Sequence, residues 1–499
     1  MEKKISPWSW IPTLYFTQGL PYVMVMSVSV MMYKNLGVSN ADIAFFTSLL
    51  YFPWFLKFAW GPFIDMFKTK RFWTVAMQII IGVALFGIAF SIQTAIYWKL
   101  TLIVFSIMAF ASATHDIAAD GFYMLSLNEN QQAAFVGVRS TFYRIATIVG
   151  SGVLVVIAGE LAPSMGFKGA WSIVFVITAV IFILFFLYHR FILPRPKSDV
   201  GTLNEKKVNW SQMGLLIGGF IAFALIVYLL FLIISYVLTS VGVISPWTTI
   251  TSTIILVLTL VLLFRTFVAW FVANYEDSET KSEVLLPVIE FLKAFVVFMQ
   301  KKDIWNILGF LLFFRFAEAQ LVKLVQPFLL DPVDKGGLGL SNTEVGIVYG
   351  TVGIIALTLG GLIGGYVISR KGLKWWLWPM VLIMHLPDLV FVYLSHLQPS
   401  NFVLINLAVA TEQFGYGFGF TAYMMFMIMV SQGEHKTAHY AICTGIMALG
   451  MMLPGMYSGA LQESIGYARF FEWVIISTIP GFVVAALVKI DPQFGIKKA

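Results

Sequence analysis

Residues 36–44 read Leu36-Gly37-Val38-Ser39-Asn40-Ala41-Asp42-Ile43-Ala44, and residues 338–346 repeat the pattern as Leu338-Gly339-Leu340-Ser341-Asn342-Thr343-Glu344-Val345-Gly346. Each copy opens a long apolar segment and places a serine three residues before an acid, which is the spacing of a helix capping box. Two similar helix starts can arise independently. However, the same offset of 302 residues also aligns the helix before each copy, so that Gln18 falls on Gln320. We therefore interpret the chain as two halves related by an internal repeat.

The composition around this repeat is that of a membrane protein. Of the 499 residues, 59% are hydrophobic and 11% are charged, whereas a soluble domain carries about 25% charged residues. A membrane span needs about 20 mostly apolar residues. This rule predicts an all-α polytopic fold with about fourteen transmembrane helices, near 8–33, 40–66, 72–97, 99–127, 132–159, 168–192, 212–240, 247–272, 303–330, 341–369, 373–397, 401–430, 435–462 and 467–489.

The predicted helices divide into three regions. An N-terminal six-helix half covers 1–192, and a C-terminal six-helix half covers 303–499. The region between them, 193–302, holds a polar linker, two extra central helices and an amphipathic stretch at 284–302. That stretch is interpreted either as a helix on the inner membrane surface or as a buried connecting helix.

The distribution of Lys and Arg predicts the orientation. With the N-terminus inside, 21 of these residues fall on the inner side and only 5 on the outer side. Inner loops are enriched in positive charge, so we expect both termini to be cytoplasmic. We also expect a multi-pass protein of the inner (cytoplasmic) membrane.

Several ionisable residues lie within predicted spans, where charge is costly and is usually kept for pairing or transport. Asp116 and Asp120 share one face of the fourth helix, beside His115. Arg139 and Arg144 on the next helix could neutralise both acids. The network is either a fixed set of ion pairs or one that loses a partner when a proton or solute arrives.

The second half carries its own buried charges. Arg315 and Glu318 are three residues apart and form a predicted local pair. Glu412 has no basic neighbour on its helix, so it is either protonated or paired with another helix. Lys57, in the first half, either pairs with an acid of the fourth helix or contacts the solute.

A short loop motif follows the second helix: Gly61-Pro62-Phe63-Ile64-Asp65-Met66-Phe67-Lys68-Thr69-Lys70-Arg71. It resembles the signature of the major facilitator superfamily, in which a glycine, an aspartate four residues later and then basic residues occupy this loop. Asp65 could latch onto a helix N-terminus or a base of the opposite half and hold a gate shut. Alternatively, Asp65 only ends a helix near water.

Further stretches carry a more specific resemblance. They are Gln18-Gly19-Leu20-Pro21, Leu56-Lys57-Phe58-Ala59-Trp60-Gly61-Pro62-Phe63-Ile64-Asp65, Ala113-Thr114-His115-Asp116-Ile117, Tyr143-Arg144, Arg315-Phe316-Ala317-Glu318 and Thr437-Ala438-His439-Tyr440-Ala441. Together they resemble the AmpG-type muropeptide permeases of the major facilitator superfamily. His115 and His439 stand where that family has glutamine, and histidine titrates near neutral pH.

The resemblance implies import of anhydro-muropeptides, such as GlcNAc-anhydroMurNAc and its peptides, for cell-wall recycling and driven by protons. Combined with the charges above, it gives a substrate-binding set of Gln18, Lys57, Tyr143, Arg144, Arg315 and Gln320. The proton-coupling set is Asp116, Asp120, His115, Glu318 and Glu412, and the gating set is Asp65, Lys70 and Arg71.

Other functions stay open at this point. A transporter of another oligosaccharide or of a metal-chelate product is the main alternative, followed by a membrane-embedded transferase and then a channel. We expect no enzyme activity, because no acid–base constellation accompanies His385 and His396. The expected partners are a small-molecule solute, protons and the lipid bilayer, but not nucleic acid. We expect no cofactor, and the single cysteine, Cys443, excludes an internal disulfide and a multi-cysteine metal site.

Overall fold

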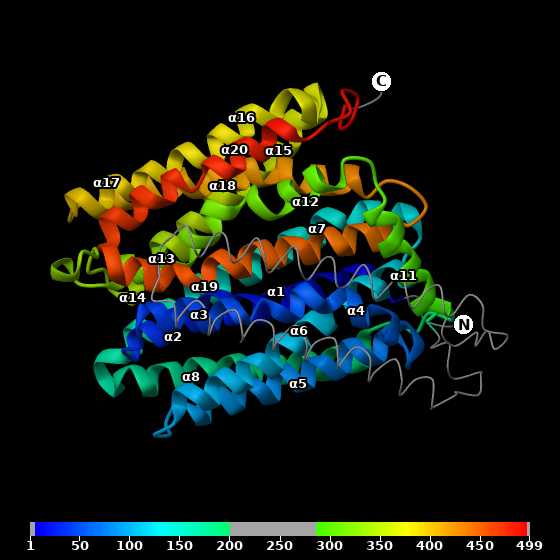
Figure 1. Ribbon diagram of the computed structural model, residues 1–499. Helices are drawn as coiled ribbons and strands as arrows, with labels where there is room; N and C mark the ends of the chain where they lie inside the picture. The colour runs from blue at the N-terminus through cyan, green and yellow to red at the C-terminus, as the bar shows by residue number, and fades with distance from the viewer. Residues whose placement is uncertain (1–4, 200–285, 497–499) are drawn as a thin grey trace, which may run out of the picture.

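The computed structural model describes residues 5–199 and 286–496, and all its regular elements are helices (Figure 1). The predicted extra helices 212–240 and 247–272 lie outside the described residues. The helices before residue 193 are α1 (Ile11–Val23), α2 (Ser29–Asn35), α3 (Asn40–Leu49), α4 (Phe52–Met66), α5 (Lys70–Ser91), α6 (Tyr97–Ser126), α7 (Glu129–Ile148) and α8 (Leu154–Ile192). Short π-helices, η2 (Met24–Val28) and η3 (Val149–Val153), join α1 to α2 and α7 to α8.

The later helices repeat this plan. They are α11 (Leu286–Met299), α12 (Ile304–Phe313), α13 (Phe316–Leu330), α14 (Asn342–Val345), α15 (Ile354–Lys371), α16 (Leu373–His385), α17 (Leu389–Leu397), α18 (Phe402–Val430), α19 (Lys436–Ile476) and α20 (Ile479–Leu487). The π-helix η6 (Gly346–Gly353) joins α14 to α15, and the 3-10 turn η7 (Leu386–Asp388) joins α16 to α17. We call α1–α8 the N-terminal group and α12–α20 the C-terminal group.

Two long helices are bent at equivalent glycines. α8 turns back at Gly166, where φ is 72°, and α19 turns back at Gly466, where φ is 78°. Glycine adopts positive φ without the steric penalty of a Cβ atom. Each glycine therefore separates two successive passes, and the spacing of the two positions differs by only two residues from the 302-residue offset of the repeat.

The two copies of the repeat begin their helices with different caps. Ser341 and Glu344 form a complete capping box. Ser39 accepts a hydrogen bond from the backbone N–H of Asp42 and its hydroxyl donates to the Asp42 carboxylate at 2.9 Å, as the Ser341 hydroxyl does to Glu344 at 2.8 Å. Glu344 also accepts from the backbone N–H of its serine, whereas the shorter Asp42 does not, so the predicted complete box is wrong for the first copy.

The outer surface is apolar along the length of the helices. Exposed side chains include Phe90, Phe191, Leu362 and Val403, each at least 66% exposed. Seven helices in the described part of the chain are long and apolar enough to cross a membrane. Such a surface would be unfavourable in water, so the exterior suits a bilayer.

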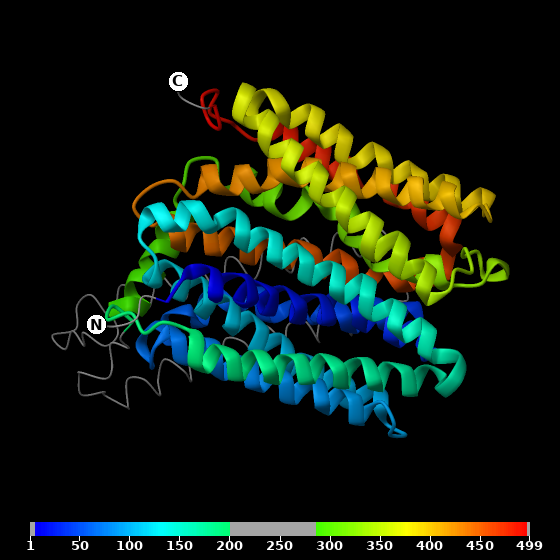
Figure 2. The same cartoon turned by 180° about the vertical axis from the view of Figure 1, so that it is seen from behind.

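The helices run roughly alongside one another, and their connections gather at two ends (Figures 1 and 2). We call one end the linker end. There, the guanidinium group of Arg71 donates hydrogen bonds to the backbone carbonyls of Leu193 and Arg190. α11 also lies at this end and packs its buried residues Ala294 and Phe298 against neighbouring helices. The predicted helix at 284–302 is therefore confirmed over Leu286–Met299, and these two residues favour its interpretation as a packed connecting helix.

The opposite end, which we call the distal end, is where the two groups bond to each other. Lys34 and Asp331 form an ion pair of 2.6 Å, and Asn35 and Asn342 exchange amide hydrogen bonds. Asn40 donates to Gln462 and Tyr467 at 2.7 and 2.8 Å. These contacts join segments 297 to 427 residues apart in sequence and close the distal end.

Close backbone approach supports the same closure. A Cβ atom on Gly459 of α19 would lie 2.0 Å from the carbonyl oxygen of Asn40 in α3. A Cβ atom on Gly350 of η6 would lie 2.0 Å from the carbonyl oxygen of Ser151 in η3. Only glycine fits at these two crossings, at each of which the C-terminal group meets the backbone of the N-terminal group.

Candidate functional site

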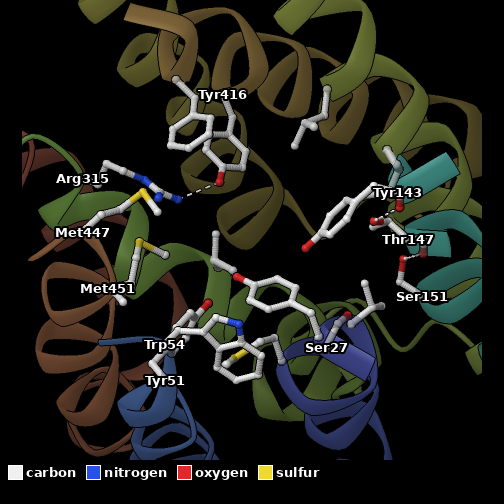
Figure 3. A pocket seen from close by; sticks show the side chains of 18 of the residues that line it. Ser27, Tyr51, Trp54, Tyr143, Thr147, Ser151, Arg315, Tyr416, Met447 and Met451 are labelled. Carbon is white, nitrogen blue, oxygen red and sulfur yellow. Dashed lines mark hydrogen bonds between the residues drawn. The ribbon is translucent and has the colours of Figure 1, made fainter. Parts of the chain in front are cut away.

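A cavity of about 390 Å³ lies between the two groups of helices (Figure 3). Ligand pockets usually measure about 300–1,000 Å³. Aromatic residues form much of its wall: Tyr22, Tyr51, Trp54, Tyr143, Tyr349, Tyr416 and Phe420. Such rings offer flat apolar faces together with hydroxyl and indole N–H groups, a combination that can receive a sugar.

The cavity has an excess of positive charge. Among the described residues that line it, Lys57, Arg144, Arg315 and Lys323 are basic and only Asp116 is acidic. Positive charge in a low-dielectric cavity attracts anions. The wall therefore suits a solute that carries an anionic group.

Arg315 is the most firmly held of these bases. Its Nε donates to Glu318 Oε2 at 2.9 Å and its Nη2 to Glu318 Oε1 at 2.5 Å. Nη2 also donates to the Tyr416 hydroxyl at 2.7 Å (Figure 3). The guanidinium lies 4.6 Å from the Phe420 ring centroid. The local pair predicted from the spacing is confirmed, so most of the charge of Arg315 is already balanced.

The fourth-helix acids have separate partners. Asp116 Oδ2 accepts a hydrogen bond of 3.0 Å from Trp54 Nε1 at the cavity wall. Asp120 accepts from Arg139 Nη2 at 2.7 Å and from the Tyr15 hydroxyl at 3.1 Å. Arg144 lines the cavity without a hydrogen-bond or ion-pair partner among the described residues. The expected neutralisation of both acids by arginine thus holds for Asp120 only.

Five residues of the predicted sets line the cavity, namely Lys57, Asp116, Tyr143, Arg144 and Arg315. Gln18 is buried and its Oε1 lacks a hydrogen-bond partner in the described part of the chain. Gln320 is instead bonded inside the C-terminal group, where Trp473 Nε1 donates to its Oε1 at 2.9 Å. Neither glutamine is among the lining residues.

Two predicted proton-coupling residues are buried within their own groups. His115 Nε2 lies 3.1 Å from Gln78 Nε2, and Gln78 Oε1 lies 3.0 Å from His189 Nδ1. Glu412 is 1% exposed and accepts from its neighbour Gln413 at 2.9 Å. These groups stand behind the cavity wall rather than on it.

The predicted gating residues lie at the linker end. The backbone N–H groups of Lys70 and Arg71 donate to the carboxylate of Asp199 at 2.6 and 2.9 Å. An acid at a helix N-terminus satisfies free N–H groups and the helix dipole. The start of α5 therefore holds an acid from the linker. The Asp65 side chain lies outside the described residues.

Sequence reasoning missed part of the wall. Lys323 is recognisable as an intramembrane charge, but it has no motif, and Gln326 and Tyr51 are ordinary residues of an apolar helix. The one sequence feature that could have identified them is their spacing, three residues from another residue that lines the cavity. Lys323 and Gln326 are one turn apart on α13, and Tyr51 lies in the turn before α4, three residues ahead of Trp54.

Relatives share the full length of the chain at low identity. A Rickettsia conorii protein named as transporter AmpG 4 is 22% identical over 482 residues, covering 94% of each chain. A protein of Escherichia coli K12 named anhydromuropeptide permease is 21% identical over 485 residues, covering 94% of this chain and 77% of its own.

Solved structures share the fold. A POT family transporter in complex with 5-aminolevulinic acid superposes with a TM-score of 0.63 at 11% identity, covering 96% of this chain and 95% of its own. The nucleoside transporter NupG superposes with a TM-score of 0.60 at 14% identity, covering 97% of this chain and 99% of its own. The family model described as Major Facilitator Superfamily matches residues 13–277, more than half of the chain. The protein is thus a secondary transporter and not an enzyme, and it belongs to the major facilitator superfamily.

Proposed function

We propose that this transporter imports anhydro-muropeptides, namely GlcNAc-anhydroMurNAc and its peptides, together with protons. The observation that carries the proposal is the cavity wall, which combines aromatic rings with four basic side chains and one acid. Sugars stack on aromatic faces, while the lactyl or peptide carboxylate of these solutes needs a cation. The full-length relative named anhydromuropeptide permease supports the same solute class.

Proton coupling would use the acids of α6. Asp116 lines the cavity and Asp120 is paired with Arg139. Since a proton on Asp120 would release Arg139, protonation can be linked to rearrangement of the helices that carry them. Proton and solute binding that share such groups are coupled reciprocally.

The transport direction in this proposal combines the distribution of basic loops with the closed end of the structure. The predicted inner side is the linker end, because the basic loops fall there. With the distal end closed by Lys34 and Asp331, solute would leave toward the cytoplasm from this conformation.

Uptake into proteoliposomes tests the solute. GlcNAc-anhydroMurNAc, its tripeptide derivative and the neutral disaccharide N,N′-diacetylchitobiose should be compared, with protein-free liposomes as control. We expect uptake and counterflow of the first two and little of the neutral disaccharide. Equal transport of the neutral sugar would refute the role of the basic wall, and absence of counterflow would refute a carrier.

A further inference from the structure

Lys323 is a buried ammonium group without a carboxylate partner in the described part of the chain. It lies on α13, is 3% exposed, and lines the cavity. Its Nζ donates one hydrogen bond, of 3.0 Å, to the hydroxyl of Thr47. It also lies 5.2 Å from the ring centroid of Tyr51.

One hydroxyl does not balance this charge. A lysine ammonium has three N–H donors, and Thr47 supplies a single neutral acceptor. The Thr47 hydroxyl itself donates to the carbonyl of Ile43 at 2.6 Å, so its remaining role toward Lys323 is that of an acceptor. A buried cation without an anion is costly, and cations inside membranes mark solute or ion pathways.

Two other buried or partly buried bases differ from Lys323 because each has a carboxylate partner. Arg315 has Glu318 within 2.5 Å, and Lys34 has Asp331 within 2.6 Å. Both are half of an ion pair before any solute arrives. Lys323 has no such partner among the described residues, so its side-chain nitrogen faces the cavity without a carboxylate.

We propose that Lys323 binds a carboxylate group of the transported solute. This inference rests on the proposed function and assigns one recognition contact within it. A single ammonium balances a single negative charge, which favours a carboxylate, such as the lactyl group of a sugar acid or a peptide C-terminus, over a phosphate dianion. The ring of Tyr51 beside the ammonium covers one side of the site.

The same contact would link recognition to movement. Lys323 belongs to the C-terminal group and Thr47 to the N-terminal group, so their hydrogen bond crosses the interface. The ammonium can bond a carboxylate through its remaining donors, and a carboxylate that draws it into the cavity does so against its hydrogen bond to Thr47. Binding of an acid would therefore remove one of the contacts that hold α13 to α3.

The experiment compares matched acid and amide ligands on purified full-length protein. One pair of probes is glucuronate and its amide glucuronamide. The other pair is GlcNAc-anhydroMurNAc and its lactyl carboxamide. Binding of each probe is measured by calorimetry. A charge-assisted hydrogen bond contributes enough for a preference of about ten-fold or more for each acid. In Lys323→Met the acid and its amide should bind with equal affinity, whereas Lys323→Arg should keep a preference for the acid.

Two further variants keep the test decisive. Gln326→Leu removes a neutral side chain one turn away on the same wall, where its Nε2 donates to Ser27 at 2.6 Å. It should alter acid and amide binding alike and leave their ratio unchanged. Thr47→Val removes the competing acceptor and should tighten binding of the acid, so it tests the site even where Lys323→Met does not fold.

The possible outcomes distinguish failure of the proposed Lys323 site from failure of the proposed function. Lys323-dependent binding of glucuronate without uptake of anhydro-muropeptides would retain the site and reject the proposed function. Uptake of anhydro-muropeptides with the same acid preference in Lys323→Met and wild type would reject the site and retain the function. Failure of the wild type to prefer any acid over its amide, or weaker acid binding in Thr47→Val, would overturn the proposal.

Discussion

Lys34 Nζ lies 2.6 Å from Asp331 Oδ1, so that an ion pair ties the end of α2 to the residue after α13. Asp331 also accepts from the Tyr467 hydroxyl at 2.6 Å. This carboxylate therefore joins three segments at the closed distal end. An acid that bonds across an interface in one conformation only will bias the equilibrium toward that conformation.

Replacing Asp331 with Asn should open the distal end more often. The reporter is a cysteine in place of Ala448, a cavity residue, in a protein whose Cys443 is replaced by Ser. An impermeant maleimide added from the distal side should react with this cysteine several-fold faster in Asp331→Asn than in the parent protein. The charge reversal Lys34→Asp with Asp331→Lys serves as control and should restore slow labelling. Equal rates in all three proteins would show that the pair does not control closure.

Asp120→Asn should uncouple transport from protons. The neutral side chain can still meet Arg139 and Tyr15, but it can no longer gain or lose a proton. Uphill uptake should disappear, while downhill exchange stays measurable in proteoliposomes. Asp116→Asn is the matched comparison one turn away. Should Asp120→Asn still concentrate solute with full pH dependence, Glu318 or Glu412 becomes the better candidate.

Gly459→Ala should disrupt the crossing of α3 and α19. The added Cβ would lie 2.0 Å from the Asn40 carbonyl, which is backbone and cannot rotate away. We expect faster distal labelling and a lower melting temperature. Gly365→Ala is the control, since nothing lies within 4 Å of its added Cβ, and alanine favours a helix over glycine by about 1 kcal/mol. A melting temperature for Gly459→Ala at or above that of Gly365→Ala would contradict the close approach.

Asp199→Ala should destabilise the linker end. It removes two hydrogen bonds to the first N–H groups of α5, and loss of a helix-capping acceptor costs about 1 kcal/mol. The melting temperature should fall, and Asp199→Asn should fall less because its amide oxygen still accepts. If alanine and wild type melt together, the acid contributes nothing to the start of α5.

The sequence predicts local features of this fold, but it does not predict contacts between distant segments. The helical passes follow from apolar length, and the pairing of Arg315 with Glu318 follows from spacing on one helix. Contacts between distant segments do not follow, and Thr47 and Lys323 are 276 residues apart. No local pattern links a threonine to a lysine at that distance.

The alignment of Gln18 with Gln320 shows a second limit of prediction from the sequence. The repeat aligns these residues, but the first pass changes to a π-helix at Met24–Val28. Its counterpart breaks earlier, between α12 and α13, where Arg315 has φ −104° and ψ 18°. A break at a different position rotates the following side chains, so aligned residues need not face the same way. The domain limits at 192 and 303 and the gating role of Asp65 stay predictions.

The time course of radiolabelled GlcNAc-anhydroMurNAc uptake into proteoliposomes under an inwardly directed proton gradient tests whether the protein is a proton-coupled importer of this solute. We expect accumulation above the external concentration, followed by collapse when a protonophore is added. Uptake no greater than in protein-free liposomes, or accumulation that the protonophore leaves unchanged, would contradict it.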